Sequence, residues 1–96
     1  MTILTIAKLE DCIDGTTTYG YHFDAPWTRD DVQRLRVLGT LEFYPDFPRP
    51  FFRLTGFGGF RIAGVLGDTF CEVTYPRRRQ EEKKQEFARL FEPVAA

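Results

Sequence analysis

Hydrophobic and polar residues alternate near the start of the chain, and this alternation predicts strands. In residues 18–23, the aromatic residues Tyr19, Tyr21 and Phe23 alternate with Thr18, Gly20 and His22. A period of two places the two sets on opposite faces of a sheet. An apolar run over residues 3–9 comes before it, and the pair Asp14-Gly15 between the two stretches tolerates the positive φ angles that tight turns need. The N-terminal region therefore predicts a β-hairpin.

The pattern then changes to the helical period. Thr28 is suited to the N-cap of a helix, and Asp31 stands at the capping-box position three residues later. Apolar residues recur at helical spacing after this cap, and Gly39 suits a left-handed C-cap. These signals predict a helix over residues 29–38.

The next part of the chain alternates strand-like runs with turn residues. The runs cover residues 41–44, 51–54, 60–65 and 69–75. Pro45 ends the first of them, because a proline cannot donate a hydrogen bond to a sheet. Short connections join the last three runs, which predict a three-stranded antiparallel meander.

The last predicted element is a helix. From Arg77 to about Phe91 the chain has no glycine or proline and many good helix formers. Pro76 suits the first turn, and Pro93 is expected to end the helix. The apolar stripe is confined to the second half of the helix and consists of Phe87, Leu90, Phe91 and Val94.

Together these elements predict a single domain over residues 1–96 of the α+β class. An antiparallel sheet, made of the N-terminal hairpin plus the three-stranded meander, carries two helices on one face in the order β-β-α-β-β-β-α. A chain of 96 residues has room for one small core.

Composition and charge narrow the class of protein. The hydrophobic share of 43% and the charged share of 28% are usual for a soluble globular domain. The net charge of −1 counts against a protein that holds nucleic acid by its phosphates, since such proteins normally carry a basic excess. No apolar run reaches the roughly 18 residues of a membrane span, and the first residues lack the charged leader of a secretory signal. We therefore expect a cytoplasmic protein that does not contact a membrane.

The chain offers few residues for catalysis or metal binding. The single histidine, His22, has no evident nucleophile beside it and fits the polar face of a strand. Cys12 and Cys71 are far apart in sequence, so they form neither a disulfide framework nor the closely spaced ligand pairs of a zinc site. The glycines of residues 56–60 lie between two predicted strands, which fits a hairpin turn rather than a phosphate loop or an RNA-binding signature. We predict no metal, no cofactor and no catalytic residue, and an enzyme that uses Cys12, Cys71 or His22 is the least favoured hypothesis.

The strongest functional indication is the aromatic segment 43–62, which holds seven aromatic rings. Neighbouring strand residues point to opposite faces, so we expect about four of these rings to be buried. Three of them are one of Phe43 and Tyr44, one of Phe51 and Phe52, and Phe60, and Phe57 is the candidate for the fourth. Two helices can cover only one face of the sheet, and rings and arginines on the other face are the residue types enriched in protein interfaces. The predicted interaction surface comprises Phe43, Tyr44, Phe47, Arg49, Phe51, Phe52, Arg53, Phe57 and Arg61.

Arg77, Arg78 and Arg79 are a second indication. Three positive charges at a helix N-terminus oppose the helix dipole, and Glu81 and Glu82 would offset them through i,i+4 pairs. One interpretation is a solvated charged face, and the other is a contact with an acidic partner.

The leading hypothesis from the sequence is a small non-catalytic protein that acts as a subunit or interaction module. Its partner would be a larger complex, for example a metabolic enzyme, or further copies of the same chain. The alternative is a module that binds a small ligand or nucleic acid on the same aromatic and arginine face, by stacking on the exposed rings. A second small core under the proline-rich segment is the competing structural interpretation of the same rings.

Overall fold

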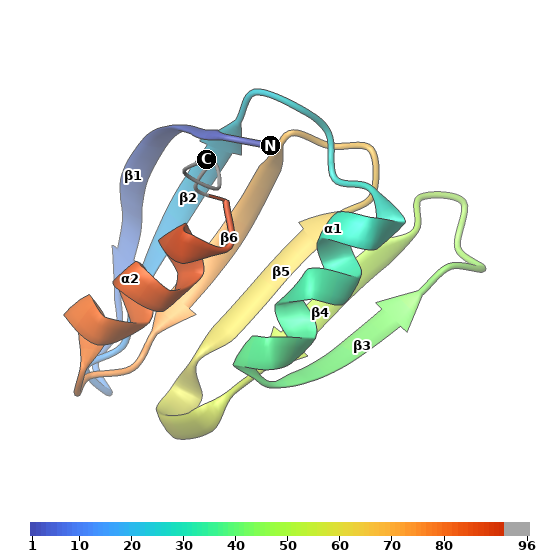
Figure 1. The fold of residues 1–96 in the computed structure, drawn as a ribbon. Coiled ribbons are helices and arrows are strands. Elements are labelled where there is room, and N and C mark those ends of the chain that lie inside the picture. The colour runs from blue at the N-terminus through green and yellow to red at the C-terminus, as the bar shows by residue number, and fades with distance from the viewer. Residues whose placement is uncertain (92–96) are drawn as a thin grey trace.

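The computed structural model describes residues 1–91 and contains one six-stranded antiparallel sheet with two helices on one of its faces (Figure 1). In chain order the elements are β1 (Ile3–Asp11), β2 (Thr17–Phe23), α1 (Arg29–Arg34), the 3₁₀ helix η1 (Leu35–Leu38), β3 (Thr40–Tyr44), β4 (Phe51–Thr55), the 3₁₀ turn η2 (Phe57–Gly59), β5 (Arg61–Val65), β6 (Phe70–Tyr75) and α2 (Gln80–Arg89). The predicted α+β class, the hairpin and the meander are confirmed. The predicted order has three strands between the helices, whereas the structure has four. The additional strand is β3, which precedes the proline-rich segment and pairs with β4 as part of the meander.

The meander connects to the N-terminal hairpin through its last strand. Each of β3, β4 and β5 pairs with the strand that follows it, and β6 pairs with β2 from Thr17–Tyr75 to His22–Phe70. The strand order across the sheet is therefore β1-β2-β6-β5-β4-β3. This order leaves β1 and β3 as the two edge strands.

The capping box predicted for the first helix is present. The Thr28 side chain accepts a hydrogen bond from the Asp31 backbone N–H at 3.2 Å, and the Thr28 N–H donates to the Asp31 carboxylate at 3.1 Å. The helix then tightens into the 3₁₀ turn η1. The left-handed C-cap predicted at Gly39 is wrong, because its φ of 164° is extended backbone. Glycine is needed there for space, since a Cβ would lie 2.4 Å from the Thr55 carbonyl oxygen.

The second helix begins later than predicted. It starts at Gln80, and Pro76 lies outside it together with the three arginines. Arg79 occupies the N-cap with a φ of 61° and makes no side-chain capping bond. The arginines therefore precede the first helical turn, and none of them is in an ion pair within residues 1–91.

The apolar stripe of α2 packs on the sheet as predicted. Phe87 and Phe91 are buried and Leu90 packs partly buried against the same core, whereas Pro93 and Val94 lie outside the described residues. None of the helices in residues 1–91 is long and apolar enough to cross a membrane.

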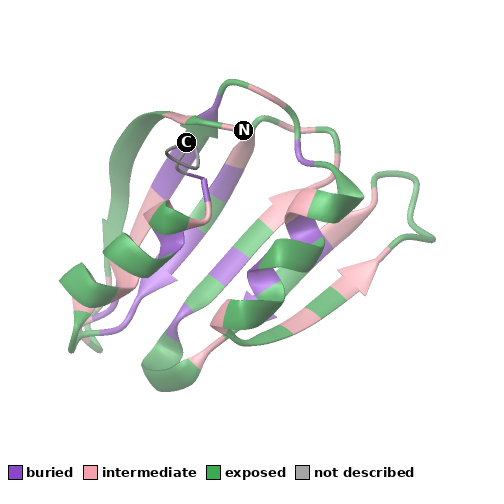
Figure 2. Cartoon of the chain, in the orientation of Figure 1, coloured by how far each residue is buried: buried purple, intermediate pink, exposed green. Residues whose placement is uncertain are grey.

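The core lies between the helices and the sheet and contains the large buried side chains of the strands. Figure 2 colours the buried positions along the chain purple. Trp27, in the loop before α1, packs against Phe23 and Phe52 with ring centroids 5.3 and 4.8 Å apart. On the α2 side, Phe87 meets the Tyr21 ring edge-on at 4.9 Å. The α1 helix lies over the half of the sheet with β4 and β5, and α2 lies over the half with β2 and β6 (Figure 1). The opposite face of the sheet is left without a helix.

Candidate interaction surface on the uncovered face of the sheet

The face of the sheet without helices, called the open face below, carries the candidate functional site. Residues opposite each other in an antiparallel ladder point to the same face, so the strand register sorts its side chains into three rows. The aromatic row consists of Tyr44, Phe51, Val65, Phe70 and His22. The charged row consists of Glu42, Arg53, Ala63, Glu72 and Gly20. The hydroxyl row consists of Thr40, Thr55, Arg61, Thr74 and Thr18.

Three rings form a cluster at the β3–β4 end of the aromatic row. Tyr44 and Phe51 stack with centroids 4.6 Å apart and an interplanar angle of 23°. Phe47, from the proline-rich loop, packs on both, at 6.2 Å from Tyr44 and 5.1 Å from Phe51. Phe47 is exposed, and the other two rings are half-buried. The cluster is therefore an apolar patch at the protein surface.

A shallow depression runs beside these rings along the charged row. Its two lobes have volumes of about 370 and 430 Å³ and share Arg53, Ala63 and Glu72 in their lining. One lobe is flanked by the Phe51 and Phe70 rings. The depression exists because Ala63 is small, while the residues on either side of it in the row are long. Its floor at Ala63 lies between an arginine and a glutamate.

The charges of the open face are of both signs. Arg53 lies opposite Glu42 in the β3–β4 register, and Arg61 lies opposite Thr74 in the β5–β6 register. Within residues 1–91 neither arginine is in an ion pair. The Tyr44 hydroxyl donates a hydrogen bond to the Glu42 carboxylate, and this bond raises the pKa of Tyr44. The open face therefore carries charges of both signs and has no basic excess of the kind that binds a phosphate chain.

The structure divides the predicted interaction residues. Each adjacent pair is split between the faces as the alternation requires: Tyr44 and Phe51 lie on the open face, whereas Phe43 faces the helices and Phe52 is buried to 1% exposure. Phe52 therefore belongs to the core and leaves the candidate surface. Phe43 lies under Arg29 of α1, with the guanidinium carbon 5.9 Å from the ring centroid.

The remaining predicted residues lie outside the rows. Arg49 is exposed in the proline-rich loop. Phe57, the candidate for a fourth buried ring and also a member of the predicted surface, lies in the η2 turn and is 92% exposed. Phe57 instead lines a separate cleft of about 570 Å³ together with Gly58, Pro76, Arg77, Arg78, Arg79 and Lys83. No pattern in the sequence indicates that Phe57 lies beside the arginines of residues 77–79.

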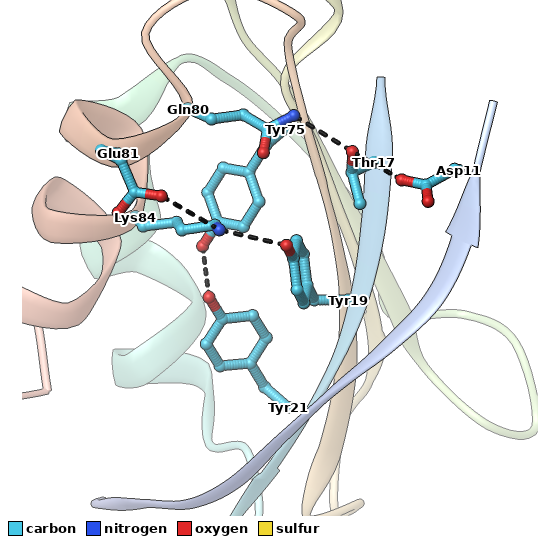
Figure 3. Close-up of polar contacts among 8 residues, drawn as sticks. All are labelled: Asp11, Thr17, Tyr19, Tyr21, Tyr75, Gln80, Glu81 and Lys84. Atoms are coloured by element: carbon cyan, nitrogen blue, oxygen red, sulfur yellow. Dashed lines mark hydrogen bonds and ion pairs between the residues drawn. The ribbon is translucent and has the colours of Figure 1, made fainter. Parts of the chain in front are cut away.

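A buried tyrosine network under α2 was not predicted (Figure 3). The hydroxyls of Tyr21 and Tyr75 form a hydrogen bond of 2.5 Å inside the core. Lys84 of α2 donates to the Tyr19 hydroxyl at 3.1 Å, and its ammonium lies 4.4 Å from the Tyr19 ring centroid. At the helix start, Gln80 donates to the Thr17 hydroxyl at 3.1 Å. These bonds hold α2 on the sheet.

The titration behaviour of this network argues for a structural role. Burial raises the pKa of both Tyr21 and Tyr75, so the two hydroxyls stay protonated near neutral pH. The hydrogen bond to Tyr19 raises the pKa of Lys84, which stays charged. A general base or an activated nucleophile would need the opposite shifts.

The other candidate chemical residues are separated from one another. Burial raises the pKa of the Cys71 thiol, which opposes thiolate formation. His22 is exposed on the open face, with its ring 4.9 Å from the Phe70 ring. Within residues 1–91 no group of three or more histidine, cysteine or carboxylate side chains could hold a metal ion.

Comparison of the chain with protein-family models, with curated proteins and with solved structures found no match. The function is therefore argued from the open face itself.

Proposed function

We propose that this protein is a non-catalytic interaction module that docks on a protein partner through its open face. The observation that carries the proposal is the cluster of Tyr44, Phe47 and Phe51 beside the depression over Ala63. Soluble chains rarely leave such apolar clusters at the surface without a partner. Aromatic rings and arginines also dominate the energetics of protein interfaces.

The proposed partner presents an apolar side chain to the depression and polar groups to its rim. The apolar side chain would enter between the Phe51 and Phe70 rings over Ala63. Arg53 and Glu72 would then each meet a group of opposite charge, since each is exposed and has no ion-pair partner in the part of the chain described. We propose a subunit of a larger complex as this partner, because the ring cluster would stay covered there.

The alternative of nucleic-acid binding on the same face is less well supported. The Tyr44 and Phe51 rings stack on each other, so one face of each ring is already occupied and unavailable to a base. The carboxylates of Glu42 and Glu72 lie in the same row as Arg53 and would repel a phosphate chain.

The test uses two variants of the open face and one control. Tyr44→Lys places a charge in the ring cluster, and Ala63→Trp fills the depression without touching the core. Val37→Lys is the control, because Val37 is 77% exposed on η1, on the helix side of the sheet. Partners retained from host lysate by the wild type are identified by mass spectrometry, purified, and titrated against each variant.

We expect both open-face variants to weaken binding of the purified partner by about tenfold or more, and Val37→Lys to bind like the wild type. Binding should fall only moderately with salt, because it would involve the two charge pairs of Arg53 and Glu72, whereas contacts to a phosphate chain would make it fall steeply. A partner that binds Tyr44→Lys and Ala63→Trp as well as the wild type would refute the proposal.

A further inference from the structure

Within residues 1–91, the large hydrophobic side chains that are exposed on strands all belong to β1. It is nine residues long, lies at the sheet edge, and all of its residues except Ile3 are exposed. Leu4, Ile6 and Leu9 are 63%, 54% and 49% exposed. Ile6 faces the side of the helices, opposite Tyr21, and Leu9 lines the depression on the open face. Apolar side chains thus remain uncovered on both sides of the same strand.

We infer that β1 pairs with β1 of a second copy of this chain in antiparallel orientation. An edge strand has a row of backbone N–H and C=O groups without partners, and the matching donors and acceptors come from another strand. Such pairing would join the two sheets into one continuous sheet. Leu4, Ile6 and Leu9 would then lie in its interior rather than at its edge.

The second copy is favoured as the occupant by the symmetry of the sheet edges. The other edge strand, β3, has five residues and is followed directly by Pro45, which cannot donate to a ladder. Pairing of β1 with β3 of a neighbour would also be a head-to-tail contact, which either closes into a ring of several copies or continues as a filament. Pairing of β1 with β1 uses one surface on both copies and closes after two.

The faces of β1 restrict the register of this pairing. Ile6 and Lys8 lie opposite Tyr21 and Tyr19 on the helix side, and Ala7 lies opposite Gly20 on the open side. Residues opposite each other in a ladder must share a face, so a shift of one residue is excluded. A two-fold axis at Ala7 places Ala7 opposite Ala7 and Ile6 opposite Lys8 of the second copy. Counted along the chain, this axis centres the nine residues of β1 on each other, and the regular pairs next to the axis are Ala7 with Ala7 and Ile6 with Lys8.

A charged side chain, Lys8, and two register shifts are features of β1 that can protect an edge strand from pairing with another chain. Both are compatible with the proposed register. Lys8 already pairs with Asp11 of its own strand at 2.6 Å, so its charge is balanced before it meets Ile6 of the second copy. The register shifts of β1 lie between Ile3 and Thr5 and between Lys8 and Glu10. The segment Thr5–Lys8 between them, which contains the proposed axis, is regular.

The register is tested by charge reversal across the axis. In Ile6→Lys, the introduced ammonium would oppose Lys8 of the second copy twice in each dimer, so we expect the dissociation constant to rise by at least about tenfold. The double variant Ile6→Lys/Lys8→Glu places opposite charges across the axis and should restore the dimer. Val37→Lys, which changes an exposed apolar residue on η1, should leave the dimer unchanged. Analytical ultracentrifugation over a concentration series measures all four proteins, with circular dichroism to confirm that each is folded.

A cross-link gives a second readout that does not disturb the interface. A short bifunctional maleimide should join Ala7→Cys in a Cys12→Ser chain into a covalent dimer, because residues directly opposite each other across two strands bring their Cβ atoms to about 5 Å. Ala63→Cys in the same background, on the open face in β5, should stay monomeric on a denaturing gel.

The inference is overturned by a wild type that is monomeric at every concentration, or by a dimer that Ile6→Lys does not weaken. A double variant that fails to recover the dimer overturns the Ala7 register. The inference is independent of the proposed function, since Tyr44→Lys should lose the partner and keep the dimer. If Tyr44→Lys dissociates the copies and Ile6→Lys does not, the open face joins them and the role assigned to β1 is wrong.

Discussion

Replacing Phe87 by alanine should remove most of the stability that α2 contributes. Phe87 is fully buried, and its ring centroid lies 4.9 Å from that of Tyr21 and 5.0 Å from that of Phe91. Truncation of a buried phenylalanine costs about 3–5 kcal/mol, because the transfer free energy of the ring is lost and a cavity is left. A domain of this length has a total free energy of unfolding of about 5–14 kcal/mol. The variant should therefore lose a large share of its stability, and its melting temperature should fall by about 12 °C or more.

Urea denaturation measures this loss, with circular dichroism reporting on helix and sheet, and Trp27 fluorescence on the core. The matched control is Phe57→Ala, which deletes the same atoms from a ring that is 92% exposed. We expect the free energy of unfolding of Phe57→Ala to stay within about 0.5 kcal/mol of the wild type. A loss below about 1 kcal/mol for Phe87→Ala, or equal losses for the two variants, would show that α2 does not pack on the sheet as described.

Four further predictions concern the core, the first helix, metal and pH. Phe91→Ala should cost about 3 kcal/mol in urea denaturation, because its ring packs against Phe23 and Trp27. Thr28→Ala should cost about 1 kcal/mol in the same assay, since it removes the capping box of α1. Dialysis against a chelator should leave the circular dichroism spectrum unchanged, and a cooperative loss of structure would reveal a metal site. The free energy of unfolding should fall as pH rises above about 10. Tyrosines of the unfolded chain release their protons there, whereas the raised pKa of Tyr21 and Tyr75 keeps both hydroxyls protonated in the folded chain. The urea midpoint as a function of pH measures this fall, and Tyr21→Phe should reduce it.

Local signals in the sequence predicted most elements of the fold, because hairpins, caps and alternation are set by neighbouring residues. The capping box at Thr28 is an example, since both of its bonds join residues three positions apart. The start of α2 was misplaced because helix-forming composition cannot show that Arg79 takes a φ of 61°. A glycine at the end of a helical pattern predicts a C-cap, and this is why Gly39 was assigned to one. The actual reason for glycine there is its close approach to Thr55, sixteen positions later, and no local pattern in the sequence indicates that approach.

The candidate site could be predicted only in part for the same reason. Alternation indicates that one ring of each adjacent pair is exposed, and the register between strands decides which one. Tyr44 and Phe51 share a face because they are opposite each other in the β3–β4 ladder. The depression over Ala63 depends on three strands in register, so no local pattern could reveal it.

The sheet has one face covered by helices and one open face, and this division allows a test of the two interpretations of the aromatic segment. One interpretation is a docking surface, and the other is a second small core under the proline-rich loop. The large, fully buried side chains lie on the helix side, so stability should depend on that side. If the cluster of Tyr44, Phe47 and Phe51 is instead a second small core under the proline-rich loop, Tyr44→Lys should destabilise the fold by an amount comparable with Phe87→Ala. If the cluster is a docking surface, Tyr44→Lys should change the free energy of unfolding by less than about 1 kcal/mol while binding is lost, because a half-buried edge ring contributes little to folding. Measuring unfolding and partner binding on the same two variants separates these outcomes, and a large loss of stability in Tyr44→Lys would remove the basis of the interaction proposal.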